Sequence, residues 1–229
     1  MVNINFSWDD GSIQDIKIAE MFNKHCVKSI FYIPSTNHER KFIGKNQINI
    51  INDLGMLIGG HTKTHRYLNT IPKDEVQEEV VSNKIYLENT IAKKIDSFCY
   101  PGGRTNSYIE KIVKKNFKKA RTAKTLCFNE KNENFNINPT FHFYDRGKKS
   151  ILKNVIQNNI EFLPLCLKYI EKDYFTFIKK IIMDLHERES VYNINIWGHG
   201  WEIQNENLWS ELNDFMKFTT SNGLNYQKI

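Results

Sequence analysis

Residues 2–11 of the chain read VNINFSWDDG. Apolar and polar side chains alternate from Val2 onward, and this period of two predicts a strand over residues 2–7. The strand leads into two adjacent acids, Asp9 and Asp10. A parallel barrel presents its reactive side chains at the carboxyl ends of its strands, so this position suits a functional site. Capping of the next helix is the competing role for Asp9, but a cap requires one acid rather than two.

A second motif, HTKTH at residues 61–65, follows two glycines. Histidines at positions i and i+4 share one face of a helix or one side of a tight loop, so His61 and His65 can reach the same ion. Two histidines and one carboxylate are a common ligand set for catalytic Zn²⁺. In isolation such a short motif is more often a pair of ordinary polar residues. The acids that end the first strand favour the metal site.

Segments typical of strands and helices alternate along the rest of the chain. The predicted strands are residues 29–33, 55–58, 97–100, 118–122 and 192–197. The predicted helices are residues 13–24, 46–54, 72–91, 107–115, 174–188 and 208–219. This alternation indicates an α/β fold with a mainly parallel sheet covered by helices, although periodicity alone does not separate a barrel from an open doubly wound sheet. Residues 129–148, rich in Asn, Pro and Lys, are predicted to form an active-site loop or lid.

The bulk composition narrows the class of protein. A length of 229 residues suits one domain over residues 1–229, because single barrels commonly reach about 200 to 250 residues. No stretch approaches the roughly 18 consecutive apolar residues of a membrane span. The formal net charge is +6, but the lysines are scattered among Asn and Ile. Without a basic stripe carrying interleaved aromatic residues, a nucleic-acid partner is not expected. The charge is interpreted as a solvated surface that would also favour an anionic substrate.

The chain start and the cysteines favour the cytoplasm. The first motif begins within the first eight residues, without a charged segment, an apolar segment and a cleavage site of the kind that makes a secretion signal. The four cysteines are widely spaced and form no CxxC pair: Cys26, Cys99, Cys127 and Cys166. This spacing fits reduced thiols better than a disulfide framework. We therefore expect a cytoplasmic protein.

Four motifs resemble those of the polysaccharide deacetylase family, also called the NodB-homology family or carbohydrate esterase family 4. The family's Thr/Ser-Phe-Asp-Asp-Gly is similar to SWDDG at residues 7–11, with Trp8 in place of Phe. Its His-Thr/Ser-x-x-His is intact at residues 61–65. Residues 98–103, FCYPGG, resemble the third motif more loosely, and residues 196–199, IWGH, resemble the last. The four motifs occur in family order and extend over most of the chain.

The resemblance implies a fold, an activity and a site. The fold would be a distorted (β/α) barrel of the NodB-homology type, with about seven strands. The enzyme would be a metal-dependent hydrolase that removes an N-acetyl or other N-acyl group from an amino sugar. Its metal ligands would be Asp10, His61 and His65. Its other groups would be Asp9 as general base, His199 as general acid and the backbone N–H of Gly102 in the oxyanion hole. The metal would be zinc, although the same ligands also accept Co²⁺, Ni²⁺ or Mn²⁺.

The chain departs from the family pattern at several positions. Cys99 stands where family members often place an arginine that orients the base, and Arg104 is the candidate to replace that arginine. The family's acid that tunes the catalytic histidine has no clean match, and Asp145 is the candidate. Tyr100 and Trp201 are predicted either to stack on a sugar ring or to pack in the core. The histidines outside the four motifs are interpreted as surface or packing residues: His25, His38, His142 and His186.

The sequence leaves three functions open. The leading one is an N-deacetylase that acts on a carbohydrate, with an intracellular glycan precursor or surface-polysaccharide intermediate as substrate. The second keeps the scaffold but hydrolyses a non-sugar amide or a cyclic imide. The third is a carbohydrate-binding protein without turnover. The retained acids and histidines of the motifs argue against this last alternative.

Overall fold

The computed structural model describes residues 1–128 and 134–226 of the chain. Seven parallel strands form one curled sheet in the order β5-β4-β3-β2-β1-β7-β6, and a short strand β8 also pairs with β1. The strands are β1 (Val2–Asp9), β2 (Ile30–Ile33), β3 (Leu57–Gly60), β4 (Ser97–Cys99), β5 (Lys119–Arg121), β6 (Phe141–His142), β7 (Tyr192–His199) and β8 (Asn225–Tyr226). The predicted distorted (β/α) barrel is thereby confirmed.

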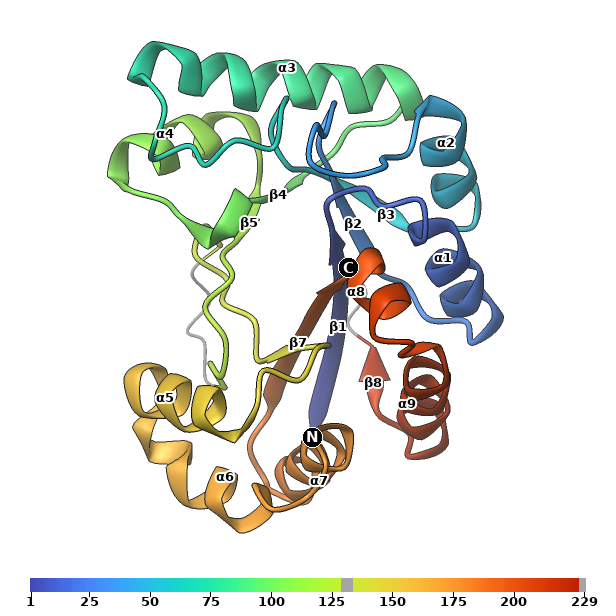
Figure 1. Cartoon of the computed structure of the whole chain (residues 1–229), viewed down its shortest axis with the longest axis vertical. Coiled ribbons are helices and arrows are strands. Elements are labelled where there is room, and N and C mark those ends of the chain that lie inside the picture. The colour runs from blue at the N-terminus through green and yellow to red at the C-terminus, as the bar shows by residue number, and fades with distance from the viewer. Residues whose placement is uncertain (129–133, 227–229) are drawn as a thin grey trace.

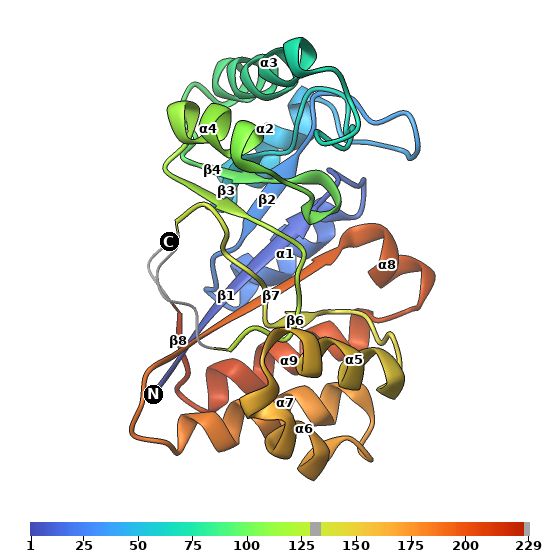
Figure 2. The ribbon, with the colours of Figure 1, turned by 90° about the vertical axis from the view of Figure 1, so that its left-hand side faces the viewer.

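Helices cover the outside of the curled sheet (Figure 1). Those that follow the first four strands are α1 (Asp15–Lys24), α2 (Lys45–Asp53), α3 (Lys73–Ile91) and α4 (Ser107–Asn116). Those on either side of β7 are α5 (Lys148–Asn158), α6 (Leu163–Tyr169), α7 (Tyr174–His186), α8 (Gly200–Asn205) and α9 (Trp209–Ser221). Two 3₁₀ turns complete the description, η1 (Pro101–Gly103) and η2 (Ile160–Phe162). Figure 2 shows α3 and α4 at one end of the molecule and α5 to α7 at the other. Within the described ranges, no helix combines the length and the apolar character that crossing a membrane requires.

An aromatic cluster fixes the central strand against the surrounding helices. The ring of Phe6 on β1 lies edge-on to Phe22 of α1, with centroids 5.0 Å apart, and to Phe215 of α9, at 6.2 Å. All three side chains are essentially fully buried. Edge-to-face packing of this kind adds about 0.5–1.5 kcal/mol per pair to the gain from burial itself. Helices from the two ends of the sequence are thus held on the same strand.

The register of β1 and β7 sets the position of the site. The two strands pair over their whole length, from Val2 opposite Tyr192 to Asp9 opposite His199. Because the two strands are parallel and in step, their carboxyl ends lie at the same edge of the sheet. β3 and β5 end at this edge as well, which brings residues that follow different strands into reach of one another.

Some predicted elements differ from the observed ones. β3 extends through Gly60, two residues beyond the predicted end, since the absent side chain of Gly59 leaves room for the Tyr32 ring on β2. In the predicted loop, residues 129–133 lie outside the described residues, but Phe141–His142 form β6 because they pair with β7. α5, α6 and α8 were not predicted.

Candidate active site

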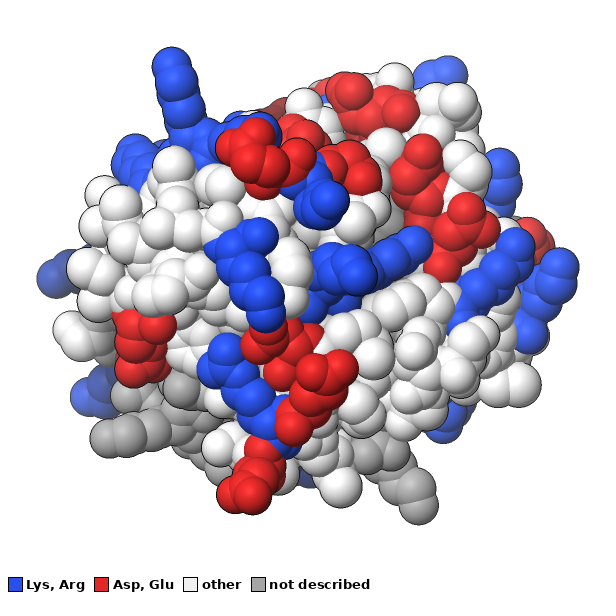
Figure 3. All heavy atoms as spheres, turned by 90° about the horizontal axis from the view of Figure 1, so that it is seen from below, with Lys and Arg blue, Asp and Glu red and all other residues white. Residues whose placement is uncertain are grey.

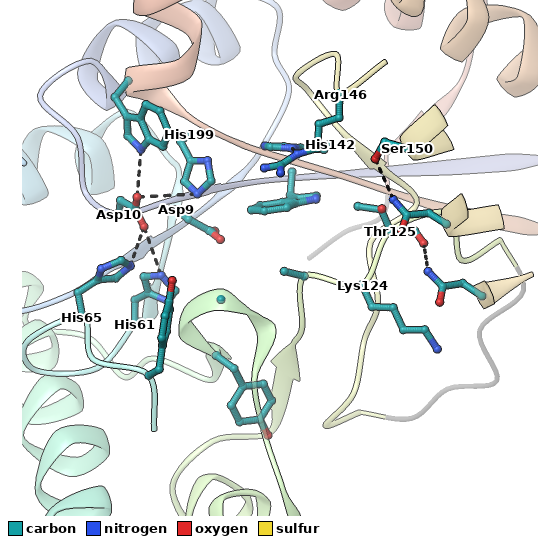
Figure 4. Close-up of a pocket in the computed structure, with 18 of the residues that line it drawn as sticks. Asp9, Asp10, His61, His65, Lys124, Thr125, His142, Arg146, Ser150 and His199 are labelled. Atoms are coloured by element: carbon teal, nitrogen blue, oxygen red, sulfur yellow. Dashed lines mark hydrogen bonds and ion pairs between the residues drawn. The ribbon is translucent and has the colours of Figure 1, made fainter. Parts of the chain in front are cut away.

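The candidate residues lie at the carboxyl edge of the sheet, around a pocket of about 640 Å³. Its lining includes Asp9, Asp10, His61, His65 and His199. Figure 4 shows these five side chains grouped at one side of the pocket. Sequence positions almost 200 residues apart therefore meet in one site because β1, β3 and β7 end together.

Asp10 is the residue on which the other groups converge. Its Oδ1 lies 3.0 Å from Nε2 of His65 and 3.5 Å from Nε2 of His61. Its Oδ2 accepts a hydrogen bond of 3.0 Å from Nε1 of Trp201 and lies 3.8 Å from Nε2 of His199. The backbone of Asp10 has a φ of 78°, a left-handed conformation uncommon for a residue with a side chain. Such strain persists where surrounding contacts impose it, typically at functional sites.

This donor set fits a divalent metal ion. The ligand atoms of Asp10, His61 and His65 lie within 4.8 Å of one another. Zn²⁺ bonds of about 2.0–2.2 Å in tetrahedral geometry place neighbouring ligand atoms about 3.4 Å apart. The separations of 3.0 and 3.5 Å between Asp10 Oδ1 and the two imidazole nitrogens bracket that value. Two imidazole nitrogens and one carboxylate oxygen could therefore bind one ion with little rearrangement.

The proton on His61 is placed to leave the metal side free. Its Nδ1 lies 2.8 Å from the backbone oxygen of Cys99. A carbonyl oxygen only accepts hydrogen bonds, so Nδ1 donates, and in the neutral ring Nε2 keeps its lone pair. A hydrogen bond from the far nitrogen is the usual way in which a protein orients a metal-binding histidine.

Helix α3 holds the segment that carries the two histidines. Residues 61–65 form a loop rather than a helix, and both Thr62 and His65 have positive φ values, of 67° and 61°. Asn83 of α3 accepts a hydrogen bond of 2.8 Å from the backbone N–H of His61. Glu79 accepts two from Thr64, one from its N–H and one from its hydroxyl, of 2.9 and 2.6 Å. The loop conformation is thus imposed by buried polar contacts with a regular element.

Asp10 and the histidines around it stabilise each other's charged forms. Burial alone would raise the pKa of Asp10, but hydrogen bonds with His61 and His65 and the charge of His199 hold that pKa well below its usual range. Burial would lower the pKa of His65, yet the hydrogen bond and charge of Asp10 raise it. Asp10 is therefore ionised throughout the physiological pH range and attracts cations, whether protons or a metal.

Asp9 is paired with an arginine that the sequence interpretation did not identify. Arg121, at the end of β5, binds both carboxylate oxygens of Asp9, and both side chains are buried. Sγ of Cys99 lies 3.5 Å from Asp9 Oδ2. Arg104, the predicted partner, is exposed, with its guanidinium over the ring of Tyr67 at 4.5 Å. The turn η1 directs Arg104 outward, whereas β5 directs Arg121 into the barrel.

His199 has a carboxylate partner, but that partner is not Asp145. Nδ1 of His199 lies 2.7 Å from Oε2 of Glu202 on α8. Asp145 is exposed and accepts a hydrogen bond from the N–H of Gly147, so it shapes a turn. Burial would lower the pKa of His199, but the hydrogen bond with Glu202 and the charge of Asp10 raise it. Since Nδ1 is held by Glu202, Nε2 is the atom that faces the pocket.

Glu202 also binds His142, which extends the network to the pocket wall. Nε2 of His142 lies 2.7 Å from Glu202 Oε2, and Nε of Arg146 donates to Nδ1 of His142 at 3.0 Å. Burial would raise the pKa of Glu202, but hydrogen bonds from His142 and His199 lower it to about 2. His142 lines the pocket and belongs to this network, so its interpretation as a surface or packing residue was incomplete. The spacing of His199 and Glu202, i and i+3, was a signal that could have identified Glu202.

The remaining predicted residues all line the pocket but differ in exposure. Gly102 lines the pocket, with a φ of 61° and with the Tyr67 ring where a β-carbon would point. Tyr100 also lines the pocket, but its side chain is fully buried and donates its hydroxyl hydrogen to the backbone oxygen of Phe135. Trp201 lines the pocket, but its indole N–H is occupied by Asp10. Both aromatic residues line the pocket, and Trp201 is the more accessible of the two because Tyr100 is fully buried.

Comparison with known proteins identifies the family to which the chain is similar. A family model described as polysaccharide deacetylase matches residues 3–119. That range contains three of the four motifs. No curated protein matches the chain significantly.

Solved structures share the fold at low sequence identity. Streptococcus pyogenes deacetylase PplD, in complex with acetate, is 22% identical with a TM-score of 0.52 over 58% of this chain and 62% of that one. A family 4 carbohydrate esterase from Streptomyces lividans, also with acetate, is 12% identical with a TM-score of 0.59 over 98% and 91%. BA3943, a CE4 family pseudoenzyme from Bacillus anthracis, is 13% identical with a TM-score of 0.57 over 98% and 62%. The chain thus spans less than two thirds of PplD and of BA3943.

Proposed function

The chain belongs to the polysaccharide deacetylase family, and from this premise we propose that it is a metal-dependent hydrolase that removes an acyl group, most simply acetyl, from the nitrogen of an amino sugar. Asp10, His61 and His65 would hold the metal, with zinc as the first choice and Co²⁺, Ni²⁺ or Mn²⁺ as alternatives. When bound, a divalent ion lowers the pKa of a coordinated water and polarises the carbonyl of the substrate.

The protein's own residues then supply the proton transfers. Asp9, held by Arg121, would accept a proton from the attacking water as the general base. His199, held by Glu202, would donate a proton from Nε2 to the departing nitrogen. The backbone N–H of Gly102 would donate to the oxygen that gains negative charge during the attack. Base and acid end neighbouring paired strands and line the same pocket, so both could reach one amide.

The substrate and the location are proposed on chemical grounds. We take the substrate to be a glycan precursor or surface-polysaccharide intermediate inside the cell. The cysteines support a reducing compartment, because all four are free thiols: Cys26, Cys99, Cys127 and Cys166.

The proposal rests on the convergence of Asp10, His61 and His65 in one place. The hydrogen-bonded pair of His199 and Glu202 lies beside them, and Asp9 is the neighbour of His199 on the paired strand. The test is release of acetate from N-acetylated sugars with and without added Zn²⁺, for wild type and Asp9→Asn. The substitution preserves shape but removes the base, so a loss of about 100-fold or more in kcat is expected. Metal binding without release from any N-acetyl sugar would contradict the proposal.

The same assay separates the two other functions. Hydrolysis of a cyclic imide, with none of an N-acetyl sugar, would indicate the second. Sugar binding without any turnover would indicate the third, and BA3943 is an example of a protein with this fold described as a pseudoenzyme. The intact set of acid, base and ligand residues favours turnover.

A further inference from the structure

The pocket extends well beyond the catalytic groups, and its two ends differ in charge. The acids that line it all lie at the metal end: Asp9, Asp10 and Glu39. The other end, which we call the α5 arm, is formed by Lys124, Thr125, Arg146, Ser150, Lys153 and Asn154. Figure 4 shows Lys124, Thr125 and Ser150 across the pocket from the Asp10 cluster, with His142 and Arg146 between them. The α5 arm contains cations and neutral polar groups but no carboxylate.

Helix α5 turns a continuous polar face toward the pocket. Five of its residues line the pocket at the helical spacing i, i+3, i+4, i+7 and i+8: Ser150, Lys153, Asn154, Gln157 and Asn158. The other face is anchored in the core by buried Ile151 and Val155. Residues at this spacing form one stripe along a helix. The pocket is therefore lined over two helical turns by an ammonium group, a hydroxyl group and carboxamides.

The lysines of the α5 arm have no carboxylate partner within residues 1–128 and 134–226. Among the described residues, no carboxylate lies within 4.0 Å of the Nζ atom of Lys124 or Lys153. By contrast Lys148, at the start of the same helix, has Glu171 at 2.5 Å. Arg146 is 4.0 Å from Glu202, a carboxylate that His142 and His199 already share. Positive charge thus remains available to a ligand.

The two walls of the α5 arm are tied together before any ligand binds. Nδ2 of Asn158 donates to the backbone oxygen of Thr125 at 2.7 Å. The backbone N–H of Phe128 donates to Oδ1 of Asn159 at 2.7 Å. These bonds join α5 to the segment that carries Lys124, so Lys124 and Lys153 project from connected walls. A preorganised site loses less entropy on binding than a mobile one.

We propose that the α5 arm binds a phosphate group of the substrate, so that the N-acylated sugar is a sugar phosphate or a nucleoside diphosphate sugar rather than a neutral polysaccharide. Ammonium and guanidinium groups together with hydroxyl and amide donors match phosphate oxygens. The pocket volume of about 640 Å³ lies in the range of small-molecule sites, about 300–1,000 Å³. This inference rests on the proposed function, because the scissile amide must occupy the metal end of the same pocket.

The test compares kcat/KM of the Zn²⁺-loaded enzyme on N-acetylglucosamine 1-phosphate, on UDP-N-acetylglucosamine and on neutral N-acetylglucosamine oligomers. We expect wild type to prefer the phosphorylated substrates by about tenfold or more. Lys124→Gln/Lys153→Gln should remove most of this preference. Lys149→Gln should retain it, since Lys149 lies on α5, carries the same charge and is exposed like Lys124 and Lys153, but it does not line the pocket. A higher ionic strength should reduce the preference, because salt screens the lysine charges.

The outcomes separate this inference from the proposed function. Equal kcat/KM for phosphorylated and neutral sugars, or a preference that survives in the double variant, would overturn the α5 arm as a phosphate site. The more active of the two phosphorylated substrates identifies whether one phosphate or a nucleotide is recognised. If no sugar is hydrolysed, the proposed function fails, and binding of UDP then decides the inference alone. UDP should bind wild type and Lys149→Gln at least about tenfold more tightly than the double variant, and equal binding would overturn the inference.

Discussion

Asp9 and Arg121 form the buried charge pair on which the proposed base depends. Both side chains are almost completely shielded from water, and no other described carboxylate lies within 4.0 Å of the guanidinium of Arg121. Arg121→Gln would leave Asp9 as a buried charge without a counterion. Breaking such a pair from one side costs about 3–5 kcal/mol of unfolding free energy. We expect a loss of this size by urea denaturation, together with a fall in deacetylation.

Arg104→Gln is the matched control for this prediction. Arg104 carries the same charge but is exposed, and among the described contacts its side chain has only the face of Tyr67 as a partner. Its substitution should change the free energy of unfolding by no more than about 0.5 kcal/mol. Equal effects of the two substitutions would show that Asp9 does not need the guanidinium of Arg121.

Glu202 sets the protonation of the proposed acid, which leads to a prediction for pH dependence. The acid form of His199 is required, so activity falls as pH rises through its pKa. The hydrogen bond with Glu202 raises that pKa, and Glu202→Gln removes the charge that does so. The alkaline limb of the kcat/KM profile should therefore move to lower pH, and kcat at neutral pH should fall by about tenfold.

Glu206→Gln provides the comparison for Glu202→Gln. Glu206 follows the same short helix but is exposed, so its loss of charge should leave the pH profile in place. A purely structural role of Glu202 would lower kcat at every pH without moving the limb. If the alkaline limb of the kcat/KM profile did not move in Glu202→Gln, the charge of Glu202 would not set the pKa of His199.

Single residues of the site were predictable where the motif lies within one short segment. Asp9, Asp10, His61 and His65 stand in two such segments, and His199 ends a clear strand. Arg121 could not be assigned from spacing, because its pairing with Asp9 over 112 positions exists only after β4 and β5 have formed. Asp145 has the expected carboxylate, but that carboxylate accepts a hydrogen bond from the N–H of Gly147 in a turn.

At the scale of elements, helix α3 holds the loop of residues 61–65, which carries two of the three proposed metal ligands. The side chain of Asn83 is fully buried and joins three segments. It accepts from the N–H of His61, and its Nδ2 donates to the backbone oxygen of Ile33 and to Oγ of Ser35, both at 3.1 Å. Asn83→Ala would leave buried backbone groups unpaired at the ends of β2 and β3. We expect a loss of about 2–4 kcal/mol in urea denaturation and weaker metal binding.

Asn89→Ala tests whether the loss of stability comes from the hydrogen bonds of Asn83 or from replacing any asparagine on α3. Asn89 lies on α3 as well, but its side chain is exposed. Alanine there should change stability by about 0.5 kcal/mol at most, since it removes no buried contact. If Asn83→Ala were equally mild, the loop of residues 61–65 would owe its conformation to other contacts.

The elements themselves were predictable to different degrees. β1 and β7 were recognisable because alternating side chains precede their motifs. The helices α5 and α6 had no such marker. α5 has apolar residues at helical spacing, Ile151, Leu152, Val155 and Ile156, but it follows Gly147, which offers no capping side chain to mark the start of the helix. The polar stripe on the other face of this helix contributes to the cationic arm of the pocket.

For the whole molecule, the net charge of +6 is less informative than the place of each charge. Lysines and acids are interspersed on the face seen in Figure 3, as expected of a solvated surface. Lys124 and Lys153 are also exposed, but they line the pocket and have no carboxylate within 4.0 Å among the described residues. Composition could not distinguish these two settings, because only the folded chain sorts its lysines between surface and pocket.

Metal binding should stabilise the entire fold, because its ligands follow β1 and β3 and are brought together only by folding. An ion present at 100 times its Kd adds about 2.7 kcal/mol, which corresponds to a rise in Tm of about 5–10 °C for a chain of this size. We expect this rise when Zn²⁺ is added to chelator-treated protein at pH 7.5. The rise in Tm should shrink as the pH falls, because Asp10 raises the pKa of His65 and protons then compete for the imidazole.

His65→Asn, which tolerates the positive φ, should abolish the rise in Tm, whereas His38→Asn at an exposed position should retain it. A rise that persisted in His65→Asn would place the ion at another site and remove the main support for metal-assisted hydrolysis.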